Sequence, residues 1–311
     1  MNGKLKWIII IAVIIVLLLV AGFIIINEMQ YHYTIEQIKE YNYFVLEQEG
    51  KSGVIDKSGN VIIPAEYIAV QIPNPSKPVF ICISSYDEET KDYETVVYNE
   101  KKETILSEFK NVQAIPIDTN IETNPYEKSN LMYKQDGKYG IITIEGKEIT
   151  KPIYSQISSL NYREGTFIVV ENGLSGVINM KGKVIIKNEY DAIISDNYYN
   201  QTTNNEQAGF IVSQKTEEGY RYGYINYHGR TILKPEYTEL ERVTQIPSEK
   251  DYYFIAFKNG QAGLLKNKKE VIHFEYEDIQ YYSVNNIFIV QRNGKQGAIT
   301  RRRKRNFKTR I

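Results

Sequence analysis

Short apolar runs recur along the chain, and polar turns separate them. Each run is rich in Phe, Ile and Val, and each is followed by a turn such as Gly50-Lys51, Gly137-Lys138 or Asn172-Gly173. Clear examples are residues 44–46, 167–170, 210–212, 254–257 and 287–290. Runs of β-branched and aromatic residues that end in Asn-Gly-type turns predict β-hairpins.

The hairpins belong to an internal repeat. Residues 53–67 read GVIDKSGNVIIPAEY, and copies begin at Gly140, Gly176 and Gly223 with glycines six apart and a tyrosine fourteen after the first glycine. Looser copies begin at Thr95 and Gly263, and a seventh begins at Gly297. Self-similarity on this scale predicts an array or ring of small β units. The repeat positions are Gly53, Gly59, Tyr67, Gly140, Gly146, Tyr154, Gly176, Gly182, Tyr190, Gly223, Gly229, Tyr237, Gly263 and Tyr276.

Each unit is predicted to be an antiparallel meander of three or four strands. The first glycine starts a strand that ends at Asp56 or its equivalent, and Gly59 closes the following turn with a positive φ angle. A third strand leads to a Glu-Tyr step and a short fourth strand. The tyrosine of that step is expected to be a buried ring with a hydrogen-bonded hydroxyl. We expect an all-β repeat domain, either a propeller-like ring, which we favour, or an open stacked array.

The repeats differ in length at one point, after the fourth strand. The extra residues fall in 71–78, 113–130, 195–207 and 244–250. Insertions that recur at one point of a repeat emerge on one face, commonly the binding face. Tyr126, Tyr198 and Tyr199 are therefore candidate binding-loop residues, although such loops are also tolerated without any function.

The N-terminal region predicts a membrane anchor. Residues 7–26 carry no charge, and a segment of this length is long enough to form one transmembrane helix. Lys4 and Lys6 precede it. The basic flank predicts a cytoplasmic N-terminus at residues 1–6, a juxtamembrane linker at 27–42 and an extracytoplasmic repeat domain at 43–300. A cleaved signal peptide is the alternative, but the apolar run continues past Val20-Ala21-Gly22, its best cleavage site.

Charge and cysteine content narrow the function classes. Cys82 is the only cysteine, so an intrachain disulfide and a Cys-based zinc site are both excluded. The net charge is zero, and seven basic residues lie in the tail 301–311 and two in residues 1–26, which leaves minus nine for residues 27–300. The acidic body predicts no nucleic-acid partner. Read in a shifted frame, Arg codons of the AGA or AGG type would restore a repeat in the tail, so a frameshift at this end is a hypothesis that the nucleotide sequence tests.

The repeat resembles the WG-repeat family, whose unit reads K-W-G-x-I-D-x-x-G-x-x-V-I-P-P-x-Y-D-x-I. The match is best at 51–67 and at 190–193, and it runs over most of residues 43–300. The chain departs from the family in lacking the tryptophan, whose positions hold Ser52, Tyr139, Ser175, Tyr222, Ala262 and Gln296. The resemblance implies an all-β binding domain, often extracytoplasmic, without common catalytic residues.

Catalytic and metal-binding motifs are absent from the sequence. The three histidines, His32, His228 and His273, show no metal-ligand spacing, and we expect no cofactor. Acidic residues cluster at Glu236, Glu239 and Glu241 and at Glu275, Glu277 and Asp278. Two carboxylates at a fixed separation are what a glycosidase requires, but the sequence does not fix that separation.

These observations predict a single-pass, membrane-anchored, extracytoplasmic protein that binds another protein or a cell-surface polymer without catalysis. The alternatives are an enzyme that acts on wall glycans through the acidic residues, and a structural subunit of a membrane complex.

Overall fold

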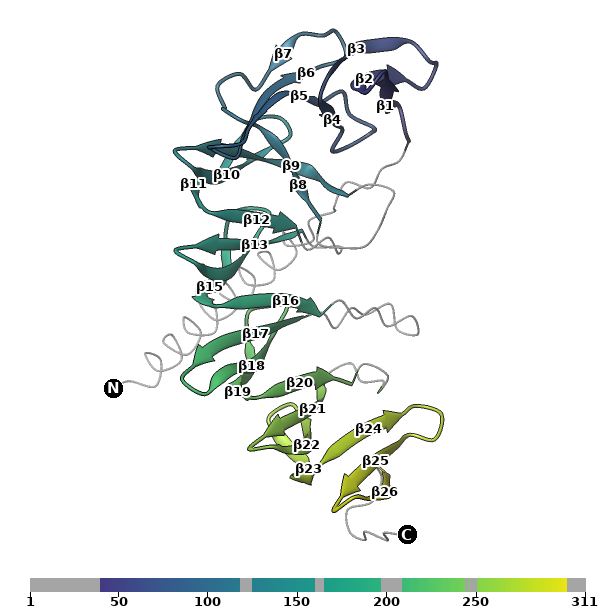
Figure 1. The fold of residues 1–311 in the computed structure, drawn as a ribbon, viewed down its shortest axis with the longest axis vertical. Coiled ribbons are helices and arrows are strands. Elements are labelled where there is room, and N and C mark those ends of the chain that lie inside the picture. Colours follow the sequence, from purple (N-terminus) through teal and green to yellow (C-terminus); the bar gives the residue numbers. More distant parts are fainter. Residues whose placement is uncertain are drawn as a thin grey trace, which may run out of the picture.

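The computed structural model describes residues 40–117, 125–159, 165–196, 209–243, 246 and 251–300, and these residues are all β (Figure 1). They form twenty-six strands in seven antiparallel sheets. No helix occurs among the described residues, and so none there is suited to cross a membrane. The predicted membrane segment 7–26 and the tail 301–311 lie outside the described residues.

The seven sheets follow one another in chain order, and we number them one to seven. They contain, in turn, β1 (Tyr43–Gln48), β2 (Lys51–Asp56) and β3 (Val61–Tyr67); β4 (Ala69–Gln71), β5 (Phe80–Asp87), β6 (Asp92–Tyr98) and β7 (Thr104–Ile105); β8 (Gln113–Pro116), β9 (Tyr126–Gln135), β10 (Lys138–Thr143) and β11 (Glu148–Tyr154); β12 (Gln156–Ser159), β13 (Thr166–Glu171), β14 (Leu174–Asn179) and β15 (Val184–Tyr190); β16 (Ala192–Asp196), β17 (Gly209–Thr216), β18 (Gly219–Asn226) and β19 (Thr231–Tyr237); β20 (Glu239–Arg242), β21 (Tyr253–Lys258), β22 (Gln261–Lys266) and β23 (Lys269–Tyr276); and β24 (Asp278–Tyr282), β25 (Ile287–Arg292) and β26 (Lys295–Thr300).

The predicted meander is present, but the sheets are offset from the sequence repeats by one strand. The short strand after each repeat tyrosine does not pair within its own repeat. After Tyr190, for example, β16 pairs with β17 of the next repeat. Each four-stranded sheet therefore takes its first strand from the preceding repeat and its other three strands from its own.

The sheets form an open stacked array, so the propeller-like ring that the sequence analysis favours is wrong. Figure 1 shows the chain descending sheet by sheet from β1–β3 at one end to β24–β26 at the other. The order of the hydrogen-bonded strands contains no pairing between the first and the last sheet. The array consequently has two ends as well as two edges.

The hydrophobic core is divided among the contacts between consecutive sheets. Between the fourth and fifth sheets, for example, Val177 and Ile186 pack against Phe210 and Val212. Six such clusters lie between the seven sheets, one at each contact. A single sheet has too little apolar area to fold alone, so each one is stabilised by its neighbours.

Two glycines show why the repeat keeps this spacing along the chain. Gly59 has a φ of +83°, a conformation that favours glycine, and the Asp56 carboxylate accepts hydrogen bonds from Ser58 N and Asn60 N across the same turn. Gly53 lies opposite a bulge in β3, where an added Cβ would come within 2.3 Å of the Ile63 carbonyl oxygen. The first glycine therefore provides space and the second provides backbone freedom.

The repeat tyrosines at the ends of the third strands pack into the stack. Tyr154, Tyr190 and Tyr276 are 5%, 6% and 5% exposed, while Tyr67 and Tyr237 are half-buried. The Tyr67 hydroxyl donates to the Tyr98 hydroxyl at 3.1 Å. Burial raises the pKa of all five phenols, and it raises that of Tyr276 to about 12. This packing agrees with a structural role for the repeat tyrosines.

Candidate functional site

The first strands of successive sheets end at one edge of the array. In Figure 1, β12, β16, β20 and β24 run in the same direction, and each ends at the same side of the molecule. Two of the predicted insertions, 195–207 and 244–250, fall at the ends of β16 and β20. We call this side the loop edge.

One of the four predicted insertions is a packed structural element. Residues 72–75, which follow β4, are buried, and Asn74 is 2% exposed. The Asn74 amide donates to the Lys128 carbonyl at 3.4 Å, and Pro75 O accepts from Asn42 N at 2.9 Å. This connection therefore links the first three sheets, so residues 71–78 are not part of a free contact surface.

Of the three candidate binding tyrosines, the structure describes only Tyr126. Tyr126 begins β9 and packs, partly buried, against the core between the second and third sheets. Burial is the largest cause of its raised pKa, and the Gln71 side chain hydrogen-bonds to it. Tyr126 thus lies in the protein body, while Tyr198 and Tyr199 lie outside the described residues.

A buried ion pair connects the strand ends of the fifth and sixth sheets. Asp196 is the last residue of β16, and Arg242 is the last residue of β20. The Arg242 guanidinium pairs with the Asp196 carboxylate and donates to the Tyr224 hydroxyl at 3.0 Å. The Tyr224 hydroxyl donates to Asp196 at 2.7 Å. The side chains of Arg242 and Asp196 are only 5% and 14% exposed.

Aromatic rings enclose the guanidinium. The Arg242 Cζ lies 5.7 Å from the centre of the Tyr224 ring and 5.1 Å from that of Tyr252, within the range of cation–π attraction. Burial strongly raises the pKa of Tyr224, so this hydroxyl is neutral and donates. We call Asp196, Tyr224, Arg242 and Tyr252 the stem cluster.

The stem cluster lies where two insertions leave the array. Asp196 directly precedes residues 197–208, and Arg242 and Tyr252 flank residues 244–250. Gly209, which follows the first insertion, lies so close to Tyr224 that an added Cβ would be 2.3 Å from the hydroxyl oxygen. The roots of both insertions are therefore in contact, and the two segments leave the array from adjacent points.

The comparison with protein families assigns the repeat. The model of the WG containing repeat matches residues 53–69, 139–174, 176–200, 222–245 and 266–295. The chain belongs to the WG-repeat family. These five matches confirm the resemblance that the sequence motifs indicate.

Other comparisons add little to this assignment. No curated protein matches the sequence. Among solved structures, a crystal structure of the eukaryotic initiation factor is similar, with 9% identity, 82% of each chain covered and a TM-score of 0.31. The extracellular domain of a hybrid two-component system from B. thetaiotaomicron has 8% identity, with 86% of this chain and 40% of that chain covered and a TM-score of 0.26. Scores of this size do not establish a shared fold.

In three repeats, a small buried residue occupies the position of the missing WG tryptophan. Its position faces the repeat tyrosine across the sheet, as in the pairs Ser52 with Tyr67, Ser175 with Tyr190 and Ala262 with Tyr276. Ser52, Ser175 and Ala262 are 3%, 7% and 0% exposed. A small residue in these WG repeats therefore lies buried beside the tyrosine ring, so the tryptophan is not needed to close this part of the sheet.

The acidic clusters do not form an isolated pair of carboxylates. Glu236 pairs with Lys258 at 3.4 Å and Glu275 with Arg292 at 2.9 Å. Glu277 accepts from Gln291 Nε2 at 3.1 Å, and Asp278 accepts from Gln280 Nε2 at 2.8 Å. Glu239 and Glu241 lie exposed on one face of β20.

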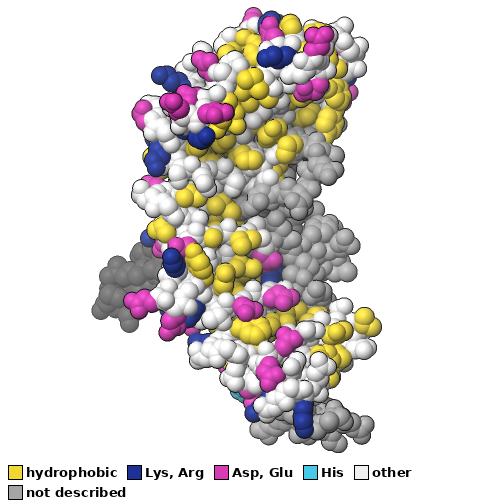
Figure 2. All heavy atoms as spheres, viewed as in Figure 1, with side chains coloured by type: hydrophobic (Ala, Val, Ile, Leu, Met, Phe, Trp, Pro, Cys, Tyr) yellow, Lys and Arg dark blue, Asp and Glu magenta, His cyan; other side chains and the backbone are white. Residues whose placement is uncertain are grey.

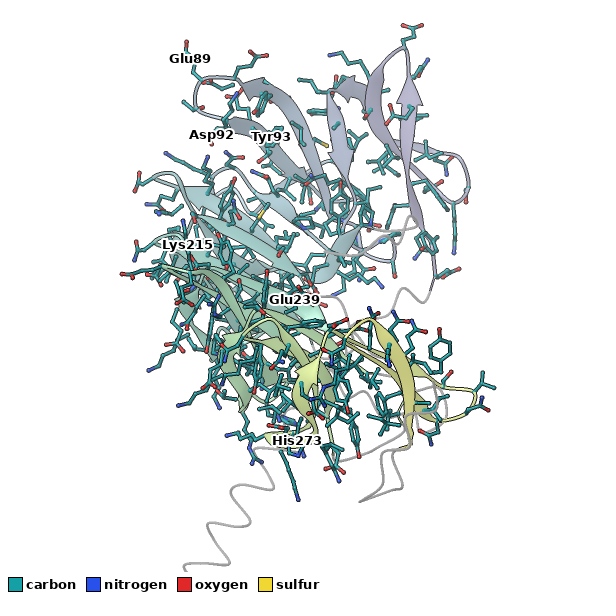
Figure 3. The ribbon with its side chains drawn as sticks, turned by 60° about the horizontal axis from the view of Figure 1, so that its bottom comes forward. Glu89, Asp92, Tyr93, Lys215, Glu239 and His273 are labelled. Atoms are coloured by element: carbon teal, nitrogen blue, oxygen red, sulfur yellow. The ribbon has the colours of Figure 1, made fainter. Side chains whose placement is uncertain are left out.

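The two histidines that the structure describes, His228 and His273, belong to no group of possible metal ligands. His273 is on β23 beside Glu270, His228 is in a turn, and Figure 3 shows His273 well separated from Glu239. Within the described ranges, no three His, Cys, Asp or Glu side chains are arranged to hold a metal ion. His32 lies outside the described residues.

The long β5–β6 hairpin carries an aromatic surface that the sequence motifs do not indicate. Tyr86 and Tyr93 face each other across the hairpin, with ring centres 4.9 Å apart, and are 42% and 39% exposed. Asp92 pairs with Lys134 of the next sheet, whose Nζ lies 5.6 Å from the Tyr139 ring centre. Figure 3 shows Glu89, Asp92 and Tyr93 projecting at one side of the molecule.

Proposed function

We propose that this WG-repeat protein is a non-catalytic binding scaffold, held at the cell membrane with its repeats outside the cell, which contacts a protein partner through the loop edge of its fifth and sixth sheets. The stem cluster is the observation that supports this proposal most directly. It brings together the roots of two long insertions from adjacent sheets, whereas the connection after β4 is packed into the body.

The physical argument rests on the cost of burying charge. Transferring an Arg and an Asp from water into the protein costs several kcal/mol per ion, and close pairing only partly offsets this cost. Between the fourth and fifth sheets, hydrophobic residues alone hold the two sheets together, and Val177 occupies the position of Tyr224. A polar cluster at this one position favours a role in fixing the geometry of the two insertions.

A protein partner is favoured over a polymer by the composition of these insertions. Residues 197–208 and 244–250 combine Tyr198 and Tyr199 with several Asn and Gln side chains, the adaptable polar and aromatic mixture typical of protein-binding loops. They carry Glu206, Glu249 and Lys250 as their charged residues, a balance that does not favour a strongly charged polymer.

Photo-crosslinking in living cells tests the binding surface. A photoreactive residue at Tyr199 should form a defined adduct with one protein, which mass spectrometry identifies, while the same residue at Tyr93 on the β5–β6 hairpin should not. Adducts at Tyr93 alone would move the binding surface to that hairpin. A chain that forms no adduct at either position would contradict the proposal.

The orientation is tested separately with protease on intact cells. If the repeats face outward, fragments of residues 40–300 are released from intact cells, and mass spectrometry detects them. Protection until the cells are lysed would contradict the proposed topology. It would leave the loop-edge proposal standing for a cytoplasmic partner.

A further inference from the structure

The first sheet has an uncovered apolar face. In five of the six later sheets, the strand that enters the hairpin buries a phenylalanine against the preceding sheet, and the third sheet has Leu131 there: Phe80, Phe167, Phe210, Phe254 and Phe288 are 0%, 0%, 2%, 0% and 1% exposed. Phe44 holds the same position in β1, opposite Ile55 as Phe167 is opposite Ile178, and is 41% exposed.

Neighbouring positions on this sheet show the same difference. Ile55 and Leu46 are partly exposed, although their counterparts Ile178 and Val169 are 1% and 0% exposed. Neither Phe44 nor Ile55 belongs to any core cluster. The Tyr41 ring stacks on Phe44 with ring centres 6.3 Å apart and is itself 43% exposed. We call Tyr41, Phe44, Leu46 and Ile55 the end face.

The other face of the same sheet is covered at its centre, although Val45 on the edge strand β1 is 41% exposed. Val54 and Ile63 are fully buried against the second sheet, and Tyr43 packs edge-on against Phe80 with ring centres 5.0 Å apart. The exposure of Phe44 is therefore not caused by a loosely formed sheet. It arises because no described element lies on that side. Figure 2 shows hydrophobic side chains on the surface of the upper part of the array, where this sheet lies.

The chain before the end face indicates what covers it. The uncharged segment ends at residue 26, and thirteen residues, 27–39, lead from there to Glu40 beside β1. Thirteen residues span at most about 45 Å when fully extended. Consecutive sheets stack roughly 10 Å apart, so of the seven sheets the first is the one held nearest to the anchor.

We propose that the end face docks on the lipid surface of the membrane in which the chain is anchored, with Tyr41 and Phe44 at the level of the lipid headgroups. This inference rests on the membrane anchor of the proposed function. The tyrosine ring, which is part apolar and part polar, favours this level of a bilayer, and an apolar ring such as that of Phe44 is buried at the boundary with the acyl chains. The array then stands on its first sheet, and the stem cluster is held about 40 Å away from the lipid.

Fluorescence quenching by lipids tests this inference. The full chain is placed in vesicles of phosphatidylglycerol and phosphatidylethanolamine with brominated acyl chains, and carries an environment-sensitive dye on Phe44→Cys. A dye on Val284→Cys, a 93% exposed residue in the β24–β25 turn of the last sheet, is the matched control. The native Cys82 interferes little, because it is fully buried and its burial raises the pKa of its thiol to about 12.

We expect brominated lipid to quench the dye at position 44 at least twofold more than the dye at position 284. Equal, weak quenching at both positions would overturn the docking. A disulfide formed between two Phe44→Cys chains in dilute detergent would also overturn it, because the end face would then be covered by a second copy.

The failure of the proposed outward orientation and the failure of the docking are distinguishable. A membrane-impermeant thiol reagent added to intact cells reports whether Val284→Cys faces outward. Labelling at position 284 without quenching at position 44 refutes the docking alone. No labelling at position 284 refutes the outward orientation, whatever happens at position 44.

Discussion

The contact between the fourth and fifth sheets and the contact between the fifth and sixth are built by equivalent repeat positions with opposite chemistry. In the former, Val177 follows the repeat glycine and packs against Phe210 in a hydrophobic cluster that contains no charged residue. In the latter, Tyr224 occupies the same position, and its hydroxyl meets Asp196 and Arg242. The backbone of the repeat therefore tolerates either a hydrophobic contact or a buried polar network between sheets. The polar one appears where two insertions begin.

The largest expected effect comes from removing the cation of the stem cluster. Arg242→Ala leaves the Asp196 carboxylate buried without its partner, and breaking a buried pair from one side costs about 3–5 kcal/mol. We expect the free energy of unfolding in urea to fall by that amount. Arg221→Ala is the control, because its partner Glu218 is 82% exposed and such pairs contribute at most about 1 kcal/mol. Equal losses for the two variants would mean that the stem cluster is no stronger than a surface pair.

A second buried charge, Glu127 at the start of β9, is expected to make stability depend on pH. It is 3% exposed, its carboxylate accepts hydrogen bonds from Ser129 N and Asn130 N, and burial raises its pKa to about 7. The folded protein therefore binds more protons than the unfolded chain between pH 4.5 and about 7. Its stability falls as pH rises through this window, by on the order of 3 kcal/mol in total.

Glu127→Gln tests this dependence, because the amide keeps an acceptor oxygen but cannot ionise. We expect the variant to lose the pH dependence in urea unfolding between pH 4.5 and about 7, and to be more stable than the natural protein at about pH 8. Glu89→Gln, at the exposed tip of the β5–β6 hairpin, is the control. If Glu127→Gln follows the natural pH profile, the buried carboxylate is not its cause.

The repeat glycines of the two neighbouring sheets should differ in a smaller way. An added Cβ at Gly223 would meet only backbone, with Leu233 O at 2.7 Å and Pro235 N at 2.7 Å. At Gly263, in the next sheet, its three nearest atoms would all belong to the Phe274 ring, at 2.8–2.9 Å, on a side chain that is able to move. We expect Gly223→Ala to cost about 1–3 kcal/mol, the range for an overpacked interior, and Gly263→Ala to cost less. Thermal unfolding of both variants measures the difference, and the opposite order would show that the bulge at Gly223 relaxes easily.

The smallest effect should come from converting the polar contact into an apolar one. The triple variant Asp196→Leu, Tyr224→Phe and Arg242→Met removes both charges and the hydroxyl together. Replacing a buried pair by apolar residues of similar volume is often neutral or stabilising. We expect the free energy of unfolding to change by less than about 1 kcal/mol, while crosslinking at Tyr199 is lost. Retained crosslinking would show that the insertions do not need the stem cluster to contact the partner.

Much of the fold was predictable because it is local. The spacing of Gly53, Gly59 and Tyr67 predicts the hairpin, the turn and the end of the third strand, since each depends on residues close in the chain. The partner of the fourth strand was not predictable in this way. Whether β16 pairs within its repeat or with β17 depends on contacts across the residues that follow Asp196, and the apolar pattern of β16 is the same in either case.

The candidate site was the least predictable part of the molecule. Asp196 and Arg242 are 46 residues apart and belong to no motif, so only the stacking of sheets brings them together. The one available signal was Tyr224, a large polar ring at a position that holds Val54, Ile141 or Val177 in other repeats. Conversely, residues 71–78 looked like an exposed insertion, and their apolar and proline side chains are what allow them to pack.

The one-strand offset between repeats and sheets has a mechanical consequence. Every sheet from the second to the seventh is completed by a strand of the repeat before it, so no repeat can leave the array without opening the sheet that follows. Force applied between the two ends of the chain would be resisted at each of these shared strands in turn. The protein should therefore extend in a series of separate steps under tension, one sheet at a time.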